Sequence, residues 1–284
     1  MSNAAADYLA LTKPRLNVLV VATSAAGFYL GADGPIDKLT LITTVAGTTL
    51  VAGGAAALNQ LYERGTDALM QRTKRRPLPD SRISPAEARA FGVLLSAAGL
   101  VLLAVYSTWL AALLALATLV IYLAIYTPLK RRSPIATLIG AIPGALPPLI
   151  GWTASHGIAL GGISLFLIVF LWQIPHFMAI AWLYRDDYAA AGFPMLPVTD
   201  PTGRRAGQQA VGYAAALVPV SLMPTLVGLS GLWYGGVAGV LSVALLVLAV
   251  RFGNARTDGT ARRLFYGSLI YLPLIWIVMI ADKR

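Results

Sequence analysis

The chain consists of long uncharged stretches separated by short segments that are rich in charge. Six stretches contain no Asp, Glu, Lys or Arg: residues 16–32, 39–62, 90–129, 133–184, 206–250 and 264–281. The first two and the last each suit one membrane helix of about 20 residues, and the other three are long enough for two helices each. Because a charged side chain at the bilayer centre is costly, the pattern predicts nine spans.

The three long stretches each contain one polar or glycine-bearing break where a turn can form. These breaks lie near residues 106–109, 155–157 and 229–231. We therefore expect an all-α polytopic membrane protein formed by a single domain, residues 1–284. Its spans are expected at about residues 16–32, 39–59, 88–107, 109–128, 136–155, 161–183, 208–229, 232–251 and 264–281.

Composition supports this class of protein. Hydrophobic residues make up 57% of the chain and charged residues 12%, whereas soluble domains are about half apolar and about a quarter charged. These values exclude a disordered chain, a nucleic-acid-binding domain and an ordinary water-soluble enzyme. Cysteine is absent, which excludes disulfides, thiolate nucleophiles and Cys-ligated metals.

The basic residues predict the orientation in the membrane. If the N-terminus is cytoplasmic, 19 of the 22 Lys and Arg residues lie on the inner side, and only Lys38, Lys283 and Arg284 lie outside. Cytoplasmic loops carry an excess of Lys and Arg, so we expect this orientation, with the C-terminus on the far side. Most of the Asp and Glu residues lie in the same cytoplasmic segments. We therefore expect the chemistry at the cytoplasmic face of the membrane, and we expect that membrane to be a cell inner membrane.

The richest polar segment begins at the cytoplasmic end of the second span. Asn59, Glu63 and Asp67 follow at spacings of four residues, which places three oxygen-bearing side chains on one face of a helix. Such oxygens suit Mg²⁺. Basic residues that can bind phosphate follow at Arg72, Lys74, Arg75 and Arg76. The spacing alone leaves two interpretations open: a magnesium-diphosphate site, or a solvated loop whose arginines only set the topology.

Several motifs resemble the UbiA superfamily of intramembrane prenyltransferases, and within it the protoheme IX farnesyltransferases. The motifs are Thr12-Lys13-Pro14-Arg15, Asn59-x3-Glu63-x3-Asp67 with Arg72-Thr73-x2-Arg76-Pro77, Tyr126-Thr127-Pro128-Leu129-Lys130-Arg131, Gly140-x3-Gly144-x2-Pro147-Pro148, Trp172-Gln173-x-Pro175-His176 and Asp186-Asp187-Tyr188. Together they cover about residues 12–200. The resemblance implies a UbiA-like helical bundle, Mg²⁺ as the cofactor, and farnesyl diphosphate and heme B as substrates. It implies transfer of the farnesyl group to a heme vinyl group through an allylic cation.

The resemblance also implies roles for single residues. Asn59, Glu63, Asp67 and Asp187 would hold metal, and Arg72, Arg76 and Arg131 would bind the diphosphate, while Tyr126, Lys130 and Asp186 would complete the catalytic group. His176 has two interpretations of equal weight, a heme contact or a hydrogen-bonded core residue. Beyond the lipid bilayer, heme-processing or terminal-oxidase assembly proteins are implied as partners.

Other functions stay open at this point. Another UbiA-type enzyme would prenylate a quinone precursor or a different aromatic or tetrapyrrole acceptor. A transporter would place ionisable groups near the middle of the bilayer, whereas here they collect at one interface. A structural assembly factor would tolerate the loss of Asp67.

Overall fold

The computed structural model describes residues 4–284, and all regular secondary structure in that range is helical. The long helices are α2 (Pro14–Gly31), α3 (Lys38–Asp67), α4 (Pro85–Tyr106), α5 (Trp109–Val120), α7 (Ala136–Ser155), α8 (Leu160–Leu183), α11 (Arg204–Leu226), α12 (Leu232–Ala255) and α13 (Asp258–Ala281). A π-helical segment, η1 (Ile121–Tyr126), and α6 (Thr127–Leu129) continue α5. Short helices α1 (Ala4–Leu11), α9 (Arg185–Ala190) and α10 (Leu196–Thr199) complete the chain. The predicted all-α class is confirmed.

Eight segments are long and apolar enough to cross a membrane when α5, η1 and α6 are counted as one. Helix α2 is not among these eight, and its first turn contains Arg15 and Asn17. It nevertheless packs along α7 inside the bundle. The count of nine spans, and the side of the membrane on which the N-terminus lies, therefore stay predictions.

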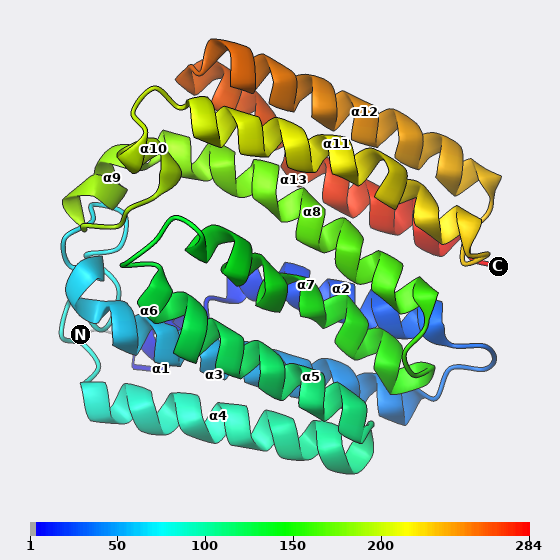
Figure 1. The fold of residues 1–284 in the computed structure, drawn as a ribbon. Coiled ribbons are helices and arrows are strands. Elements are labelled where there is room, and N and C mark those ends of the chain that lie inside the picture. The colour runs from blue at the N-terminus through cyan, green and yellow to red at the C-terminus, as the bar shows by residue number, and fades with distance from the viewer. Residues whose placement is uncertain (1–3) are drawn as a thin grey trace.

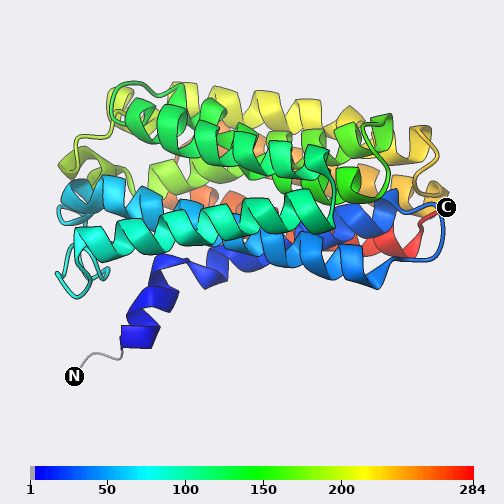
Figure 2. The ribbon, with the colours of Figure 1, turned by 90° about the horizontal axis from the view of Figure 1, so that it is seen from below.

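Helices α7 and α8 lie in the middle of the bundle, with α2–α5 on one side of them and α11–α13 on the other (Figure 1). The largest apolar cluster joins α7 and α8 to α11–α13, and a second joins α7 to α2, α3, α4 and α5. The view from below shows that the long helices lie roughly along one common axis (Figure 2). We call one end of the bundle the basic end. It contains α1, the end of α3, and residues 68–84, 130–135 and 184–203.

Close packing between α2 and α7 depends on glycine. A Cβ atom at Gly151 would overlap the carbonyl oxygen of Ser24, and one at Gly27 would overlap the carbonyl oxygen of Pro148. Small residues allow membrane helices to approach backbone to backbone, where dispersion forces hold them together. This contact fixes α2, and with it the turn at Lys13 that leads into α2, relative to the rest of the bundle.

Helix α3 carries the predicted metal motif beyond the expected end of its span. The span was expected to end near residue 59, but the helix continues for about two turns to Asp67. Gly65 lies within this extension, where an added side chain would meet open space. The whole Asn59–Asp67 segment is therefore helical, and it lies at the basic end.

The glycine contact predicts a stability effect. We expect Gly151→Ala to lower the free energy of unfolding by about 1–3 kcal/mol, because the added methyl group forces α2 and α7 apart. Thermal unfolding of the detergent-purified protein measures this effect. Gly236→Ala on α12 is the matched control, because a Cβ atom there meets nothing within 4 Å. Equal unfolding temperatures for Gly151→Ala and the wild type would contradict the proposed contact.

Candidate functional site

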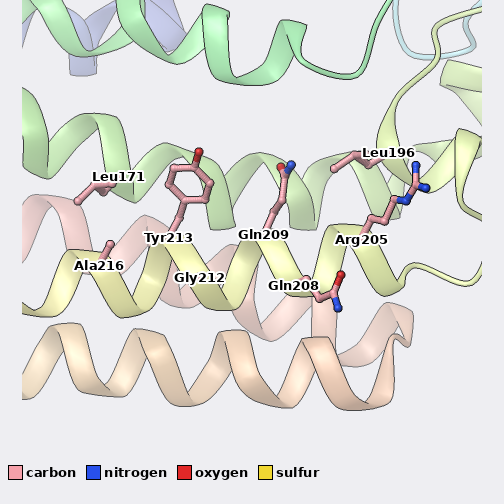
Figure 3. A pocket seen from close by; sticks show the side chains of 8 residues that line it. All are labelled: Leu171, Leu196, Arg205, Gln208, Gln209, Gly212, Tyr213 and Ala216. Atoms are coloured by element: carbon pink, nitrogen blue, oxygen red, sulfur yellow. The ribbon is translucent and has the colours of Figure 1, made fainter.

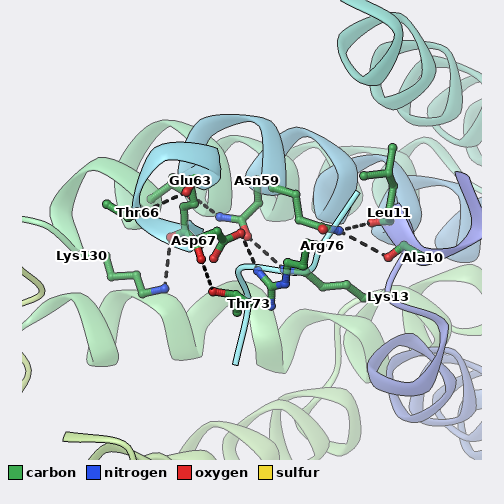
Figure 4. Close-up of polar contacts among 12 residues, drawn as sticks. Ala10, Leu11, Lys13, Asn59, Glu63, Thr66, Asp67, Thr73, Arg76 and Lys130 are labelled. Carbon is green, nitrogen blue, oxygen red and sulfur yellow. Dashed lines mark hydrogen bonds and ion pairs between the residues drawn. The ribbon is translucent and has the colours of Figure 1, made fainter. Parts of the chain in front are cut away.

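Three side chains at the end of α3 form a buried row of oxygens. Asn59, Glu63 and Asp67 are 2%, 6% and 1% exposed, and Figure 4 shows them side by side along α3. Each accepts a hydrogen bond from a different cation. Lys13 Nζ lies 3.1 Å from Asn59 Oδ1, Lys130 Nζ lies 3.1 Å from Glu63 Oε1, and Arg76 donates to Asp67 Oδ2 at 2.7 Å.

The three cations come from separate parts of the chain. Lys13 lies in the turn between α1 and α2, with a left-handed backbone, φ 49°. Arg76 belongs to the loop after α3, and Lys130 directly follows α6. The row therefore joins the α1–α2 turn, the long basic loop after α3 and the end of α6 into one site at the basic end.

The electrostatics of the site raise the pKa of Lys130 and lower the pKa of Lys13. Burial lowers the pKa of Lys13 to about 8, and the positive charge of Arg76 acts in the same direction. Burial also lowers the pKa of Lys130, but Tyr126 and Glu63 raise it by more, so the net shift is upward. An additional negative charge in the site would stabilise both ammonium groups.

The amide of Asn59 links α3 to the π-helical segment. Its Nδ2 donates to Thr127 Oγ1 at 3.1 Å, and Tyr122 donates its hydroxyl to Asn59 Oδ1 at 3.3 Å. Thr127 Oγ1 in turn donates to the Tyr122 carbonyl at 2.7 Å. π-Helical turns occur frequently at functional sites. Here the turn presents Tyr122 toward Asn59.

Asp67 retains one oxygen without a partner. Within residues 4–284, its Oδ1 atom is buried and forms no hydrogen bond, although Oδ2 is bound by Arg76. The Thr73 hydroxyl donates to the Asp67 carbonyl at 2.8 Å and holds the following loop in place. A buried carboxylate oxygen without a partner calls for an explanation, and a bound ion is one. Together with Asn59 and Glu63, this oxygen is a donor set that fits Mg²⁺.

Arg72 and Lys130 face aromatic rings from the segment that follows α8. The Arg72 guanidinium lies 5.0 Å from the ring centre of Tyr184 and 5.9 Å from that of Tyr188. Lys130 Nζ lies 4.5 Å from the ring centre of Phe193. These contacts bring the α8–α10 connection against the loop after α3, where an apolar cluster of Met70, Ala181, Tyr188, Ala191, Phe193 and Met195 seals the junction.

The predicted second acidic group is near the same end but is not joined to the row. Asp186 and Asp187 lie in the first turn of α9; Asp186 is exposed and Asp187 half-buried. In residues 4–284, neither carboxylate forms a hydrogen bond or ion pair, and no three His, Cys, Asp or Glu side chains form a group that could hold a metal ion. The structure therefore does not bring Asp187 into one acidic cluster with Glu63 and Asp67.

The remaining predicted residues lie in different surroundings. Tyr126 stacks on Tyr122 with ring centres 5.4 Å apart, and its ring covers Gly140 of α7. Arg131 is exposed, and its side chain forms no hydrogen bond or ion pair with residues 4–284. Of Tyr126 and Arg131, only Tyr126 lies next to a residue of the site, which is Tyr122.

His176 is packed between α8 and α13. Its Nδ1 atom lies 2.8 Å from the Ser268 hydroxyl, and its ring stacks on Trp172 and Phe265. Ser268 Oγ donates to the Phe265 carbonyl, so it accepts from Nδ1–H, which leaves the lone pair on Nε2. Nε2 forms no hydrogen bond within residues 4–284. These contacts are those of a packed core histidine, and a heme contact through Nε2 stays a prediction.

Sequence reasoning missed three residues that belong to this geometry. From the sequence, Lys13 is interpreted only as a topology charge and as part of the opening motif, and Thr127 and Tyr188 only as parts of motifs. The opening motif Thr12-Lys13-Pro14-Arg15 was the available signal for Lys13, because it stands apart from the other basic segments. No spacing along the chain connects residues 13 and 59.

Comparisons with known proteins identify the family of the chain and its fold. The sequence pattern of the UbiA prenyltransferase family matches residues 20–275. The chain is 46% identical to a protoheme IX farnesyltransferase of Solibacter usitatus, over 98% of both chains. It is 47% identical to a protein of the same name from Opitutus terrae, over 98% of this chain and 94% of the relative.

Solved structures share the fold. A structure of a digeranylgeranylglyceryl phosphate synthase superimposes with a TM-score of 0.83 at 18% identity, over 97% of each chain. A UbiA homolog from Archaeoglobus fulgidus, bound to GPP and Mg²⁺, superimposes with a TM-score of 0.71 at 19% identity, over 97% of this chain and 99% of that one. The chain, a helical integral membrane protein, belongs to the UbiA prenyltransferase family.

Proposed function

We propose that this protein transfers the farnesyl group of farnesyl diphosphate to a vinyl group of heme B, giving heme O and diphosphate. The observation that carries the proposal is the buried row of Asn59, Glu63 and Asp67 with its surrounding cations. Relatives named protoheme IX farnesyltransferase, similar over nearly the whole chain, support heme B as the acceptor. The cytoplasmic side of the membrane is proposed for the basic end.

The charges of the site suit a diphosphate. Lys13, Arg72, Arg76 and Lys130 outnumber the two carboxylates of the row, so the site is net positive before any substrate binds. Guanidinium groups bind phosphate oxygens in a bidentate way, and ammonium groups act as point charges. Arg131 is proposed as a further diphosphate ligand from the exposed segment after α6.

Residues of the site are proposed for each step of the reaction and for contact with each substrate. When held by Asn59, Glu63 and Asp67, magnesium would neutralise charge on the diphosphate, and Asp187 is proposed to hold metal at the second acidic group, apart from this row. Lys130 and Arg76 bind the departing diphosphate oxygens, and the Tyr126 hydroxyl donates to one of them. Asp186 completes the second acidic group, at the start of α9. His176 is proposed to contact the heme through Nε2.

The C1–O bond of farnesyl diphosphate breaks, and its electron pair leaves with diphosphate. The π electrons of the vinyl group form the new carbon–carbon bond to C1, and a water oxygen adds to the other vinyl carbon and loses a proton. The rings of Tyr122 and Tyr126, which stack beside the row, can stabilise the allylic cation in the absence of water.

A direct assay separates this proposal from its alternative. Purified protein with heme B, farnesyl diphosphate and Mg²⁺ should form heme O, detected by mass, with diphosphate release that needs no ion gradient. Another UbiA-type prenyltransferase, acting on a quinone precursor, would instead consume an aromatic acid acceptor. Product from that acceptor alone would refute heme B as the substrate.

Substitution of Asp67 tests the row. We expect Asp67→Asn to lower kcat at least about 100-fold. The amide conserves the shape of the side chain but removes the negative charge that offsets the neighbouring cations and any bound metal. Asp80→Asn is the matched control, since Asp80 is an exposed carboxylate on the loop that follows Asp67. Gel filtration and thermal unfolding should show both variants folded. Heme O formation at the wild-type rate by Asp67→Asn would refute the role.

Substitution of Lys130 tests the diphosphate partners. We expect Lys130→Gln to lower kcat/KM for farnesyl diphosphate about 10–100-fold, because the half-buried ammonium is lost from the Glu63 side of the site. Steady-state kinetics at fixed heme B measure the change. Arg132→Gln, which removes an exposed charge two residues away, should leave kcat/KM unchanged. Equal effects of the two substitutions would show that only the general positive potential matters.

A further inference from the structure

Helix α1 buries a carboxylate while its apolar residues face outward. Asp7 is 4% exposed, whereas Ala4, Ala6 and Leu9 are exposed. The view from below shows that α1, beside the N-terminus, lies at an angle to the long helices (Figure 2). A carboxylate is seldom fully buried unless a cation is paired with it, so the burial of Asp7 calls for an explanation.

The partner of Asp7 is Arg82, which lies 75 residues later in the long basic loop after α3. Arg82 Nη1 donates to Asp7 Oδ1, and Nη2 donates to the Arg75 carbonyl at 2.8 Å. The next residue is Arg76, whose side chain binds Asp67 of the row. One guanidinium therefore joins α1 to the backbone that presents a cation of the site.

The other end of α1 is attached to α3 beside the row. The Gln60 amide donates to the Leu11 carbonyl at 2.7 Å, close to the turn that contains Lys13 (Figure 4). Gln60 directly follows Asn59, which accepts a hydrogen bond from Lys13. Leu11 is also packed in an apolar cluster with Ala57, Leu61, Leu78, Ile83 and Ala88. The position of α1 therefore determines where the Lys13 ammonium lies.

Two turns beside these contacts have left-handed backbones. Lys13, between α1 and α2, has a φ of 49°, and Ser81, directly before Arg82, has a φ of 57°. In a residue other than glycine, this conformation costs free energy and persists where surrounding contacts hold it. The Asp7–Arg82 pair joins the two segments that contain these turns.

We propose that Asp7 and Arg82 are a positioning pair, which arranges Lys13 and Arg76 for the diphosphate before the substrate binds. This inference rests on the proposed function. Within residues 4–284, neither side chain bonds to the row, so each acts through a segment that supplies a cation. Groups that already hold the bound arrangement lose less entropy on binding, so the pair contributes to affinity.

The pair is expected to affect binding more than the chemical step. Once diphosphate is bound, its own charge attracts Lys13 and Arg76, and their positions then depend less on α1. We expect Asp7→Asn to raise the Kd for farnesyl diphosphate about 3–10-fold and to change kcat by less than about twofold. Calorimetry with Mg²⁺ and without heme B measures the Kd, and steady-state kinetics measure kcat and the KM for heme B.

The sign of the effect separates positioning from general electrostatics. Asp7→Asn removes a negative charge from a site for an anion, so the potential of the site alone predicts tighter binding. The same guanidinium provides the matched control. Arg82 Nε donates to Asp80 Oδ2 at 2.9 Å, but the Asp80 side chain is 53% exposed, against 6% for Asp7. Exposed ion pairs contribute little, so Asp80→Asn should leave the Kd unchanged.

A double variant tests whether the two residues act together. Arg82→Gln should weaken binding at least as much as Asp7→Asn, and the double variant should match Arg82→Gln, because both substitutions break one interaction. Arg205→Gln controls for the loss of a cation. Arg205 extends toward Leu196 in a pocket of about 700 Å³ that residues of α8, α10 and α11 line (Figure 3), and its substitution should leave the Kd unchanged.

Thermal unfolding should show all of these variants folded, and Asp7→Glu, which conserves the charge, should bind farnesyl diphosphate more tightly than Asp7→Asn. Unchanged or tighter binding in Asp7→Asn would overturn the inference. So would effects that multiply in the double variant, or a fall in kcat as large as the rise in Kd. A wild-type protein that does not bind farnesyl diphosphate would instead refute the proposed function.

Discussion

Glu63 and Asp67 are carboxylates that are almost fully buried at the end of a largely apolar helix, and burying such a charge is costly unless a cation is paired with it, as Lys130 and Arg76 are here. Removing one partner of a buried pair leaves an uncompensated charge, which costs about 3–5 kcal/mol. The Arg76 and Lys130 segments are therefore held against α3 by charge, and Lys13 joins them through Asn59. The positions of these segments at the basic end therefore depend on the pairing of each buried carboxylate with a cation.

Much of the fold follows from the distribution of charge along the sequence. Uncharged stretches must be helical in a membrane, and the three long stretches each contain a polar or glycine-bearing segment, so the breaks near residues 107, 156 and 230 could be located from the sequence alone. The structure places helix ends at Tyr106, Ser155 and Leu226. The extension of α3 to Asp67 and the π-helical segment Ile121–Tyr126 could not be located in this way. Both depend on contacts with distant segments, which a hydropathy pattern does not contain.

Part of the site could also be predicted from the sequence. Helical spacing alone places Asn59, Glu63 and Asp67 on one face, because their separation is local. Which cation pairs with each of these residues depends on tertiary contacts, because Lys13 and Lys130 are 46 and 67 residues away from their partners. The placement of Asp187 apart from the row likewise depends on how helices pack. Motif resemblance named Asn59, Glu63 and Asp67 but could not state their distance from Asp187.

The distances along the chain between the paired residues also order the assembly of the site. Asp67 and Arg76 are nine residues apart, whereas Glu63 and Lys130 are 67 apart. Protein synthesis proceeds from the N-terminus, so Lys13 exists before the row, Arg76 follows it closely, and Lys130 appears last. Until α4 and α5 have been made, Glu63 has no Lys130 beside it. All three cations that pair with the row are present once residue 130 has been synthesised. The helices made later pack around a set of charges that is already complete.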